Sequence, residues 1–166
     1  MDRELLKTAD REITDEVRMQ FEKGWLWEVA LSRAFGEKAA VRPKPIELDG
    51  IVGSPDGVIP DIPPAQWVGD GSAVRTCEAG LIVEEYKCTA MSSRKSPADM
   101  WKWIMQVKGY CKMLGTTKCI FRVLHVRDFV PVYNPWELVF TQAELDENWQ
   151  AILNQAKTMK EIDNGA

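Results

Sequence analysis

Apolar residues spaced by about one helical turn characterise the first part of the chain. Val17, Phe21 and Trp25 follow this spacing, which predicts helix within residues 3–36, in two pieces. Thr14 and the two acids after it are typical of a helix N-terminus, because the hydroxyl caps backbone N–H groups and the acids face the positive end of the helix dipole. The chain is therefore expected to open with helical structure.

Two capping sequences predict further helices. Ser96-Pro97-Ala98-Asp99 combines a capping serine, a proline at the first helical position and an acid three residues after the cap. We expect this helix to run to about Leu114, because Gly115 is a typical C-terminal stop. Thr141-Gln142-Ala143-Glu144 is a capping box, which predicts a final helix to about Ile162.

Runs of β-branched and other apolar residues between the helices predict strands. Residues 46–59 are expected to form a hairpin, with its turn either at Asp49-Gly50 or at Pro55-Asp56-Gly57. Residues 60–75 are rich in proline and glycine, which predicts a loop. Further strands are predicted at residues 81–87, 119–126 and 130–139.

This order of elements predicts an α/β (α+β) fold with a central mixed β-sheet flanked by helices. The chain has 166 residues, 45% hydrophobic and 28% charged, which fits a single domain over residues 1–166 with a real core. No apolar run is long enough to cross a bilayer, and no apolar segment follows Met1 as in a signal peptide. We therefore expect a cytoplasmic protein with no membrane partner.

Charge is distributed unevenly along the chain. The net charge of −4 argues against indiscriminate binding to nucleic acid. Residues 86–127 nevertheless contain nine Lys or Arg and one acid, so this segment carries +8 and the remainder carries −12. Such a segment favours a polyanionic partner, because binding to phosphates releases counterions. A basic helix face that is merely solvated is the alternative.

Three charged side chains are predicted to lie at strand ends. Residues 80–84 have the pattern of a strand entering a core, and the side-chain period of two places Glu85 and Lys87 on one face. Asp56 follows Pro55 near the end of an earlier strand. Two carboxylates and an ammonium can hold a hard divalent cation and orient a water against a phosphodiester. A turn aspartate, and a surface acid beside a snorkelling lysine, are the structural alternatives.

Glu84 offers a second register for the same motif. Its partner two residues later is Tyr86, which is not a lysine, so Glu85 is the preferred acid. Clustered carboxylates repel one another, so one of them should have a raised pKa when no metal is bound, and Lys87 should relieve part of this effect.

Four short motifs together resemble the PD-(D/E)XK nuclease superfamily. They are Gly24-x-x-x-Glu28, Pro55-Asp56, Glu85-Tyr86-Lys87 and Gln106-x-x-x-Tyr110. The sequence is most similar to the RecB-like branch, which includes phage exonucleases, and the resemblance covers roughly residues 20–125. The motifs occur in the family's order and on the expected elements. RecB-like members often have histidine in the first motif, where this chain has Glu28.

The resemblance implies a restriction-endonuclease-like core that binds one or two Mg²⁺ or Mn²⁺ ions. The implied metal ligands are Glu28, directly or through water, Asp56, Glu85 and the backbone carbonyl of Tyr86. The residues implied in catalysis are Asp56, Glu85, Lys87, Gln106 and Tyr110. Among these, Lys87 would orient the attacking water, while Gln106 and Tyr110 would position the site and the DNA strand.

Basic and aromatic residues around the last motif are candidates for DNA binding. The expected phosphate or strand contacts are Arg94, Lys95, Lys102, Lys108 and Tyr110. Trp101 and Trp103 could stack on bases, although at least one is expected to pack in the core. His125 lies in a predicted strand and is expected to be structural, and the four cysteines are expected to be free thiols, mostly buried.

These observations predict a metal-dependent DNA nuclease, an exonuclease of DNA recombination, repair or phage DNA processing. Two alternatives stay open. One is a structure-specific or restriction-type endonuclease, and the other is a nucleic-acid-binding module with weak catalysis on the same fold. The expected partners are DNA and either further copies of the chain or a helicase or recombinase. A virus-encoded origin fits this interpretation.

Overall fold

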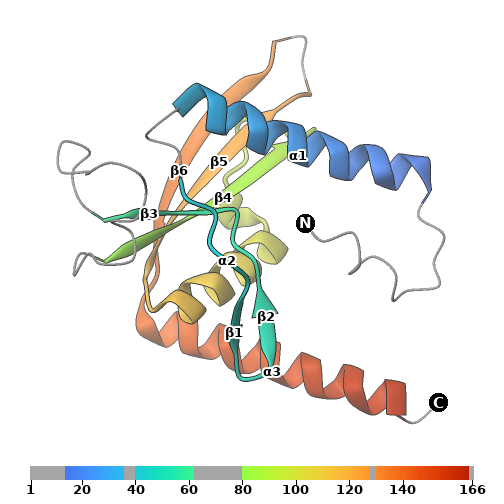
Figure 1. Cartoon of the computed structure of the whole chain (residues 1–166), viewed down its shortest axis with the longest axis vertical. Coiled ribbons are helices and arrows are strands. Elements are labelled where there is room, and N and C mark those ends of the chain that lie inside the picture. The colour runs from blue at the N-terminus through green and yellow to red at the C-terminus, as the bar shows by residue number, and fades with distance from the viewer. Residues whose placement is uncertain (1–13, 36–39, 62–79, 128–129, 165–166) are drawn as a thin grey trace.

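The computed structural model of the chain describes residues 14–35, 40–61, 80–127 and 130–164, and in these residues the architecture is a mixed sheet between helices (Figure 1). The sheet has the strand order β3 (Gly57–Pro60), β4 (Leu81–Thr89), β5 (Lys118–His125) and β6 (Val132–Val139). The β4–β5 pair is parallel, and the other two pairs are antiparallel. The predicted mixed sheet flanked by helices is confirmed.

Helices cover both faces of this sheet. α1 (Asp15–Phe35) contacts β4 on one face, where the Trp27 indole N–H donates to the backbone carbonyl of Arg122 over 3.2 Å. α2 (Trp101–Leu114) crosses the opposite face and connects the parallel strands β4 and β5, and α3 (Gln142–Asn164) packs against α2. Figure 1 shows α1 separated from α2 and α3 by the strands.

The core lies between the sheet and α2. Along β5 every second side chain is buried, so Phe121 and Val123 face α2 while their neighbours face α1. They pack with Val83 of β4 and Val107 of α2, all with no exposed surface. Trp103 stacks on Phe121 with a ring-centroid distance of 6.2 Å. Truncation of Phe121 to alanine would cost about 3–5 kcal/mol, the usual range for a large core aromatic.

The described part of the predicted N-terminal helical region is one continuous helix, α1, and the rest of that region, residues 3–13 and 36, lies outside the described residues. α1 begins at the predicted cap, where the Thr14 hydroxyl accepts the N–H of Val17 over 3.4 Å. Its regularly spaced apolar side chains do not reach the core. Phe21 and Trp25 are 49% and 54% exposed, and Leu31 is the residue of this helix that is buried. The helix is therefore attached along only part of its length.

The hairpin uses the first of the two turns considered. β1 (Ile46–Leu48) pairs with β2 (Ile51–Gly53) around Asp49 and Gly50, which have φ angles of 52° and 76°. Two successive positive φ values give a turn whose twist matches the strands, and Asp and Gly tolerate them best. The Trp149 indole N–H donates to Asp49 Oδ2 over 2.9 Å and anchors the hairpin to α3.

The capping motifs fix the helix starts, with one correction. Ser96 caps a short 3₁₀ turn, Pro97–Asp99, and α2 itself begins at Trp101, because Met100 has non-helical angles. Gly115 ends α2 in the left-handed conformation as predicted. The Thr141–Glu144 capping box is present, with Thr141 N–H donating to Glu144 over 2.8 Å and Glu144 N–H to the Thr141 hydroxyl over 3.2 Å.

Most of the predicted loop at residues 60–75 lies outside the described residues, as does Cys77. Cys88, Cys111 and Cys119 are free thiols, the last two buried, as expected. Within the described part of the chain, no helix has the length and apolar character that a membrane span requires.

Candidate active site

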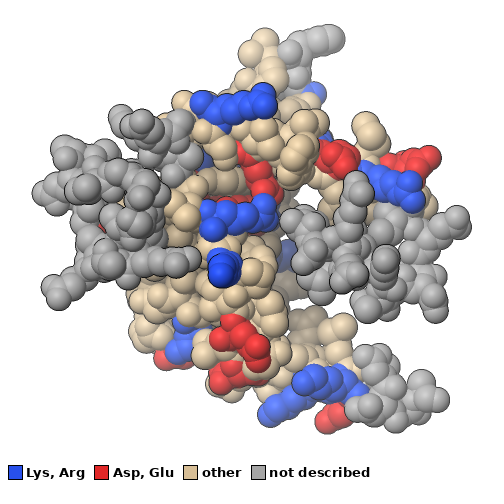
Figure 2. Space-filling view, viewed as in Figure 1, with Lys and Arg blue, Asp and Glu red and all other residues tan. Residues whose placement is uncertain are grey.

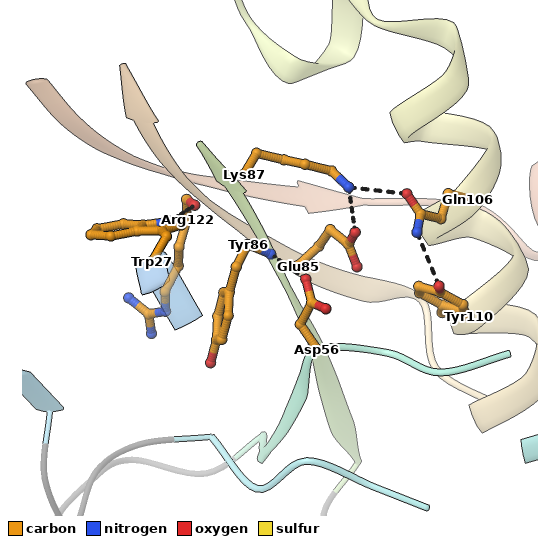
Figure 3. Close-up of polar contacts among 8 residues, drawn as sticks. All are labelled: Trp27, Asp56, Glu85, Tyr86, Lys87, Gln106, Tyr110 and Arg122. Carbon is orange, nitrogen blue, oxygen red and sulfur yellow. Dashed lines mark hydrogen bonds and ion pairs between the residues drawn. The ribbon is translucent and has the colours of Figure 1, made fainter. Parts of the chain in front are cut away.

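Glu85 and Lys87 lie on the α2-facing side of β4, as the strand period predicts. Lys87 Nζ is 2.6 Å from Glu85 Oε1, and the Glu85 side chain is only 2% exposed (Figure 3). Lys87 also lies over the Trp103 ring, 5.8 Å from its centroid. An acid this deeply buried is tolerated because a cation is bound to it.

Asp56 is brought to β4 by the pairing of β3 with β4. It precedes Gly57, which lies opposite Glu84, and its Oδ2 accepts the backbone N–H of Tyr86 over 2.8 Å. The chain approaches closely here, since a Cβ atom at Gly57 would lie 2.5 Å from Ala40. Strand pairing and a glycine therefore place the Asp56 carboxylate beside the Glu85 segment.

α2 contributes a chain of hydrogen-bonded side-chain amide and hydroxyl groups to this side of the site. Lys87 Nζ donates to Gln106 Oε1 over 3.1 Å, and Gln106 Nε2 donates to the Tyr110 hydroxyl over 3.0 Å (Figure 3). Residues four apart share a helix face, so Gln106 and Tyr110 both point toward β4. The lysine ammonium is thus held between a carboxylate and an amide.

Glu28 approaches the acids from α1. It is half-buried, and Arg42 Nη1 lies 2.8 Å from its Oε2. Its charge is close enough to those of Asp56 and Glu85 to repel both. All the residues of the four sequence motifs that were assigned chemistry therefore converge, from four segments of the chain.

The electrostatics of this cluster match the expectation from the sequence. Burial, and then the charge of Asp56, raise the pKa of the Glu85 carboxyl to about 7, while Lys87 limits the rise. Burial followed by the charge of Asp56 raises the pKa of Glu28, and burial raises that of Asp56 against the opposing Tyr86 N–H. A cation bound among these carboxylates would remove the repulsion.

The donor set fits a hard divalent cation. Glu85 Oε2 is buried and has no hydrogen-bond partner among the described atoms, and Asp56 uses only one oxygen in its bond to Tyr86. Carboxylate and carbonyl oxygens are the ligands that Mg²⁺ and Mn²⁺ prefer. Among the residues described, no three His, Cys, Asp or Glu side chains form a ready-made metal cluster, and Lys87 and Arg42 contact two of the carboxylates.

A second polar network lies on the other face of β4. Glu84 is 1% exposed and accepts hydrogen bonds from Arg122 and, over 2.8 Å, from the Tyr86 hydroxyl. Arg122 also donates to the Tyr133 hydroxyl over 2.8 Å and lies 4.5 Å from the Phe35 ring. Glu84 and Glu85 thus point to opposite faces. Sequence reasoning missed Arg122, although a charged residue inside the apolar strand β5 was a usable signal.

The structure distributes the expected DNA contacts unevenly. Lys102, Arg94 and Lys95 are exposed, and Lys102 lies one turn before Gln106 on the same face of α2. Lys108 instead pairs with Glu144 over 3.2 Å at the α2–α3 contact. Figure 2 shows acidic side chains recessed between Lys and Arg side chains near the middle of the face drawn.

The remaining candidates separate cleanly. Trp103 packs against the core, whereas Trp101 is 68% exposed at the start of α2. His125 is buried and its Nδ1 lies 3.1 Å from the Met91 carbonyl, which fits the structural role expected of it. Arg42, which contacts Glu28, was not identified from the sequence because nothing in its local pattern distinguishes it.

Comparison with known proteins identifies similar folds but no sequence family. The chain matches no protein-family model and no curated protein. Among solved structures, an alkaline exonuclease (LHK-Exo) from Laribacter hongkongensis is similar with a TM-score of 0.51 and 18% identity, over 93% of this chain and 75% of that chain. A protein named SSO0001 has a TM-score of 0.47 and 16% identity, over 86% of this chain and 61% of that chain, so this chain spans less than two thirds of SSO0001. The likeness to the exonuclease shows a shared fold.

Proposed function

We propose that this chain is a metal-dependent deoxyribonuclease of the PD-(D/E)XK type that acts as a RecB-like exonuclease. The observation that carries the proposal is that Asp56, Glu85 and Lys87 lie together beside one buried oxygen of Glu85 that has no partner among the described atoms, with Glu28 close enough to repel Glu85. The similarity of the fold to that of an alkaline exonuclease supports it. Such an enzyme would serve DNA recombination, repair or phage DNA processing, as a homo-oligomer or beside a helicase or recombinase.

Oxygen atoms from four residues would hold Mg²⁺ or Mn²⁺: Glu28, Asp56, Glu85 and the backbone carbonyl of Tyr86. When bound, the ion would lower the pKa of a coordinated water and offset negative charge on the phosphate oxygens. The chain contributes rigid carboxylates for this purpose. Glu85 is fixed by burial, and Asp56 is fixed by the Tyr86 N–H.

Lys87 supplies the cation that belongs to the protein itself. Its ammonium is held 2.6 Å from Glu85 and 3.1 Å from Gln106, so its position is defined before any substrate arrives. A positioned ammonium can donate a hydrogen bond to the attacking water and stabilise charge that develops on the phosphate. Gln106 and Tyr110 act as positioning residues for Lys87, since the amide is itself fixed by the tyrosine hydroxyl.

The DNA would lie along the exposed N-terminal end of α2. Lys102 continues the face that carries Gln106 and Tyr110, and Arg94 and Lys95 lie on the turn that precedes this helix. Each phosphate neutralised in this way adds salt dependence to binding. Lys108 is paired with Glu144 at the α2–α3 contact and is not part of this proposed surface.

A cleavage assay with linear and covalently closed DNA tests the proposal. Single- and double-stranded forms are incubated with Mg²⁺, Mn²⁺ or EDTA, beside Asp56→Ala and Lys87→Ala. The matched controls are Asp15→Ala and Lys157→Ala, which change exposed residues of the same types away from the proposed DNA surface. We expect metal-dependent loss of linear DNA that both site variants abolish and both controls retain.

Other results would redirect or reject the proposal. Cleavage of closed circles would show an endonuclease. DNA binding without cleavage under any metal would reject the enzyme and leave a binding module. Cleavage that persists in both site variants would show that the reaction takes place elsewhere.

A further inference from the structure

A cavity of 440 Å³ lies beside the carboxylates, between α1 and the segment that leads to β3. Its volume is within the range of about 300–1,000 Å³ that is usual for small-ligand pockets. Glu28 and Asp56 form part of its wall, so the cavity and the proposed metal site share two residues. Any occupant would therefore lie next to the proposed metal site.

Basic and hydroxyl groups line the same cavity. Arg33, Arg42 and Ser32 all contribute to it. Arg42 is paired with Glu28, whereas Arg33 is exposed and forms no ion pair with another described residue. A guanidinium with its donors available in a concave site is suited to a phosphate, which it can bind in bidentate fashion.

The same cavity has an aromatic wall. Trp25 lines it, yet the indole remains 54% exposed on a helix whose other face meets the sheet. An exposed indole at the wall of a cavity offers a partner an apolar surface to cover. A nucleic-acid base is a suitable partner, because every base has a π-face that stacks on an indole.

We propose that this cavity binds one nucleotide of the cleaved strand, the one adjacent to the scissile phosphate. Its phosphate would contact Arg33 and Arg42, and its base would stack on Trp25. The inference rests on the proposed nuclease function and adds the substrate group that the site recognises. Arg42 would link the two sites, because it contacts Glu28 on the shared wall.

Binding of mononucleotides in EDTA tests the cavity apart from catalysis. Without divalent metal, the carboxylate site cannot bind a phosphate through an ion. Deoxyadenosine 5′- and 3′-monophosphates, deoxyadenosine and inorganic phosphate are titrated into the whole chain by calorimetry. The variants are Arg33→Gln and Trp25→Ala, with Arg18→Gln and Leu26→Ala as controls, both exposed on α1 and away from the cavity.

We expect each of the two site variants to lower the binding affinity for one of the monophosphates by roughly tenfold. This is the scale of a charge-assisted contact or a stacked base. Deoxyadenosine should lose affinity only with Trp25→Ala, and phosphate only with Arg33→Gln. Unchanged affinities, equal losses in the control variants, or no binding of either monophosphate would overturn the inference.

Steady-state cleavage of short oligonucleotides separates this inference from the proposed function. Arg33→Gln should raise KM about tenfold and leave kcat within about twofold, because it removes binding and not chemistry. Active enzyme with unchanged KM would overturn the cavity proposal alone. If the chain is inactive but still binds a monophosphate through Arg33 and Trp25, the proposed nuclease function is rejected and the proposed nucleotide site stands.

Discussion

The backbone N–H of Tyr86 donates to Asp56 Oδ2 over 2.8 Å, so the loop before β3 is fastened to the strand that carries Glu85 and Lys87 (Figure 3). The two residues are thirty positions apart in sequence. The bond leaves the other oxygen of Asp56 available and fixes its direction. The hydrogen bond thereby joins two short motifs, each weak by itself, into one rigid site.

This relationship predicts different results for two substitutions of Asp56. Asparagine keeps an oxygen that can accept the Tyr86 N–H but removes the charge, so stability should change little while cleavage falls by at least roughly a hundredfold, the scale of an electrostatic catalytic contribution. Alanine removes both and should also lower the unfolding midpoint. Rates and thermal melts of the two variants, with Asp15→Asn as the control, measure the difference. Equal stability losses for both would show that the hydrogen bond does not anchor the loop.

Replacement of Lys87 by methionine should lower the cleavage rate by about 10²–10⁴-fold, the range for a positioned proton-transfer or charge-stabilising group. It should also raise the pKa of Glu85, because the Lys87 charge holds that pKa down. The pH midpoint of Mn²⁺ binding, followed by calorimetry, should therefore move upward, with Lys157→Met as control. An unchanged midpoint would contradict the coupling of the two side chains.

The raised pKa of Glu85 predicts how the stability of the metal-free protein depends on pH. Its pKa is raised to about 7 in the folded chain. Between its unfolded pKa near 4.3 and about 7, the folded state therefore binds more protons than the unfolded state, and stability falls as pH rises. Above about pH 7 Glu85 is ionised in both states, and its burial then lowers the free energy of unfolding by the full amount, on the order of 3 kcal/mol.

Glu85→Gln removes this ionisation. In EDTA, the variant's gain in unfolding free energy over the wild type should therefore be small near about pH 5 and largest near about pH 8. Urea unfolding across this range measures it, with Glu47→Gln on the exposed face of β1 as the control. A difference that does not vary with pH would mean that Glu85 is already ionised at low pH.

The Glu84–Arg122 pair should be important for stability. Arg122→Met leaves the Glu84 carboxylate buried without its cation, which costs about 3–5 kcal/mol for a pair of this kind. Adding Glu84→Gln to Arg122→Met should recover part of the lost unfolding free energy, because the buried charge without a partner is then removed. Urea unfolding of the two single variants, the double variant and Arg18→Met gives the coupling. Additive losses would show that the two residues act independently.

The sequence by itself determined the local structure and the identity of the motifs. Thr14 and Thr141 cap their helices as predicted, and Ser96 forms a capping bond but to the 3₁₀ turn before α2, because caps act through neighbouring backbone groups. The period of two in β4 correctly separated Glu85 from Glu84, because alternation is a property of any strand. These features depend on contacts within a few residues.

Tertiary structure decided what distant segments do to one another. It showed that Val17, Phe21 and Trp25 of α1 are exposed, although their spacing resembles that of a buried face. It paired Arg42 with Glu28, Arg122 with Glu84 and Lys108 with Glu144, and it formed the cavity beside Asp56. Such contacts depend on how whole elements pack, and side-chain spacing along one element carries no information about which partner lies across the interface.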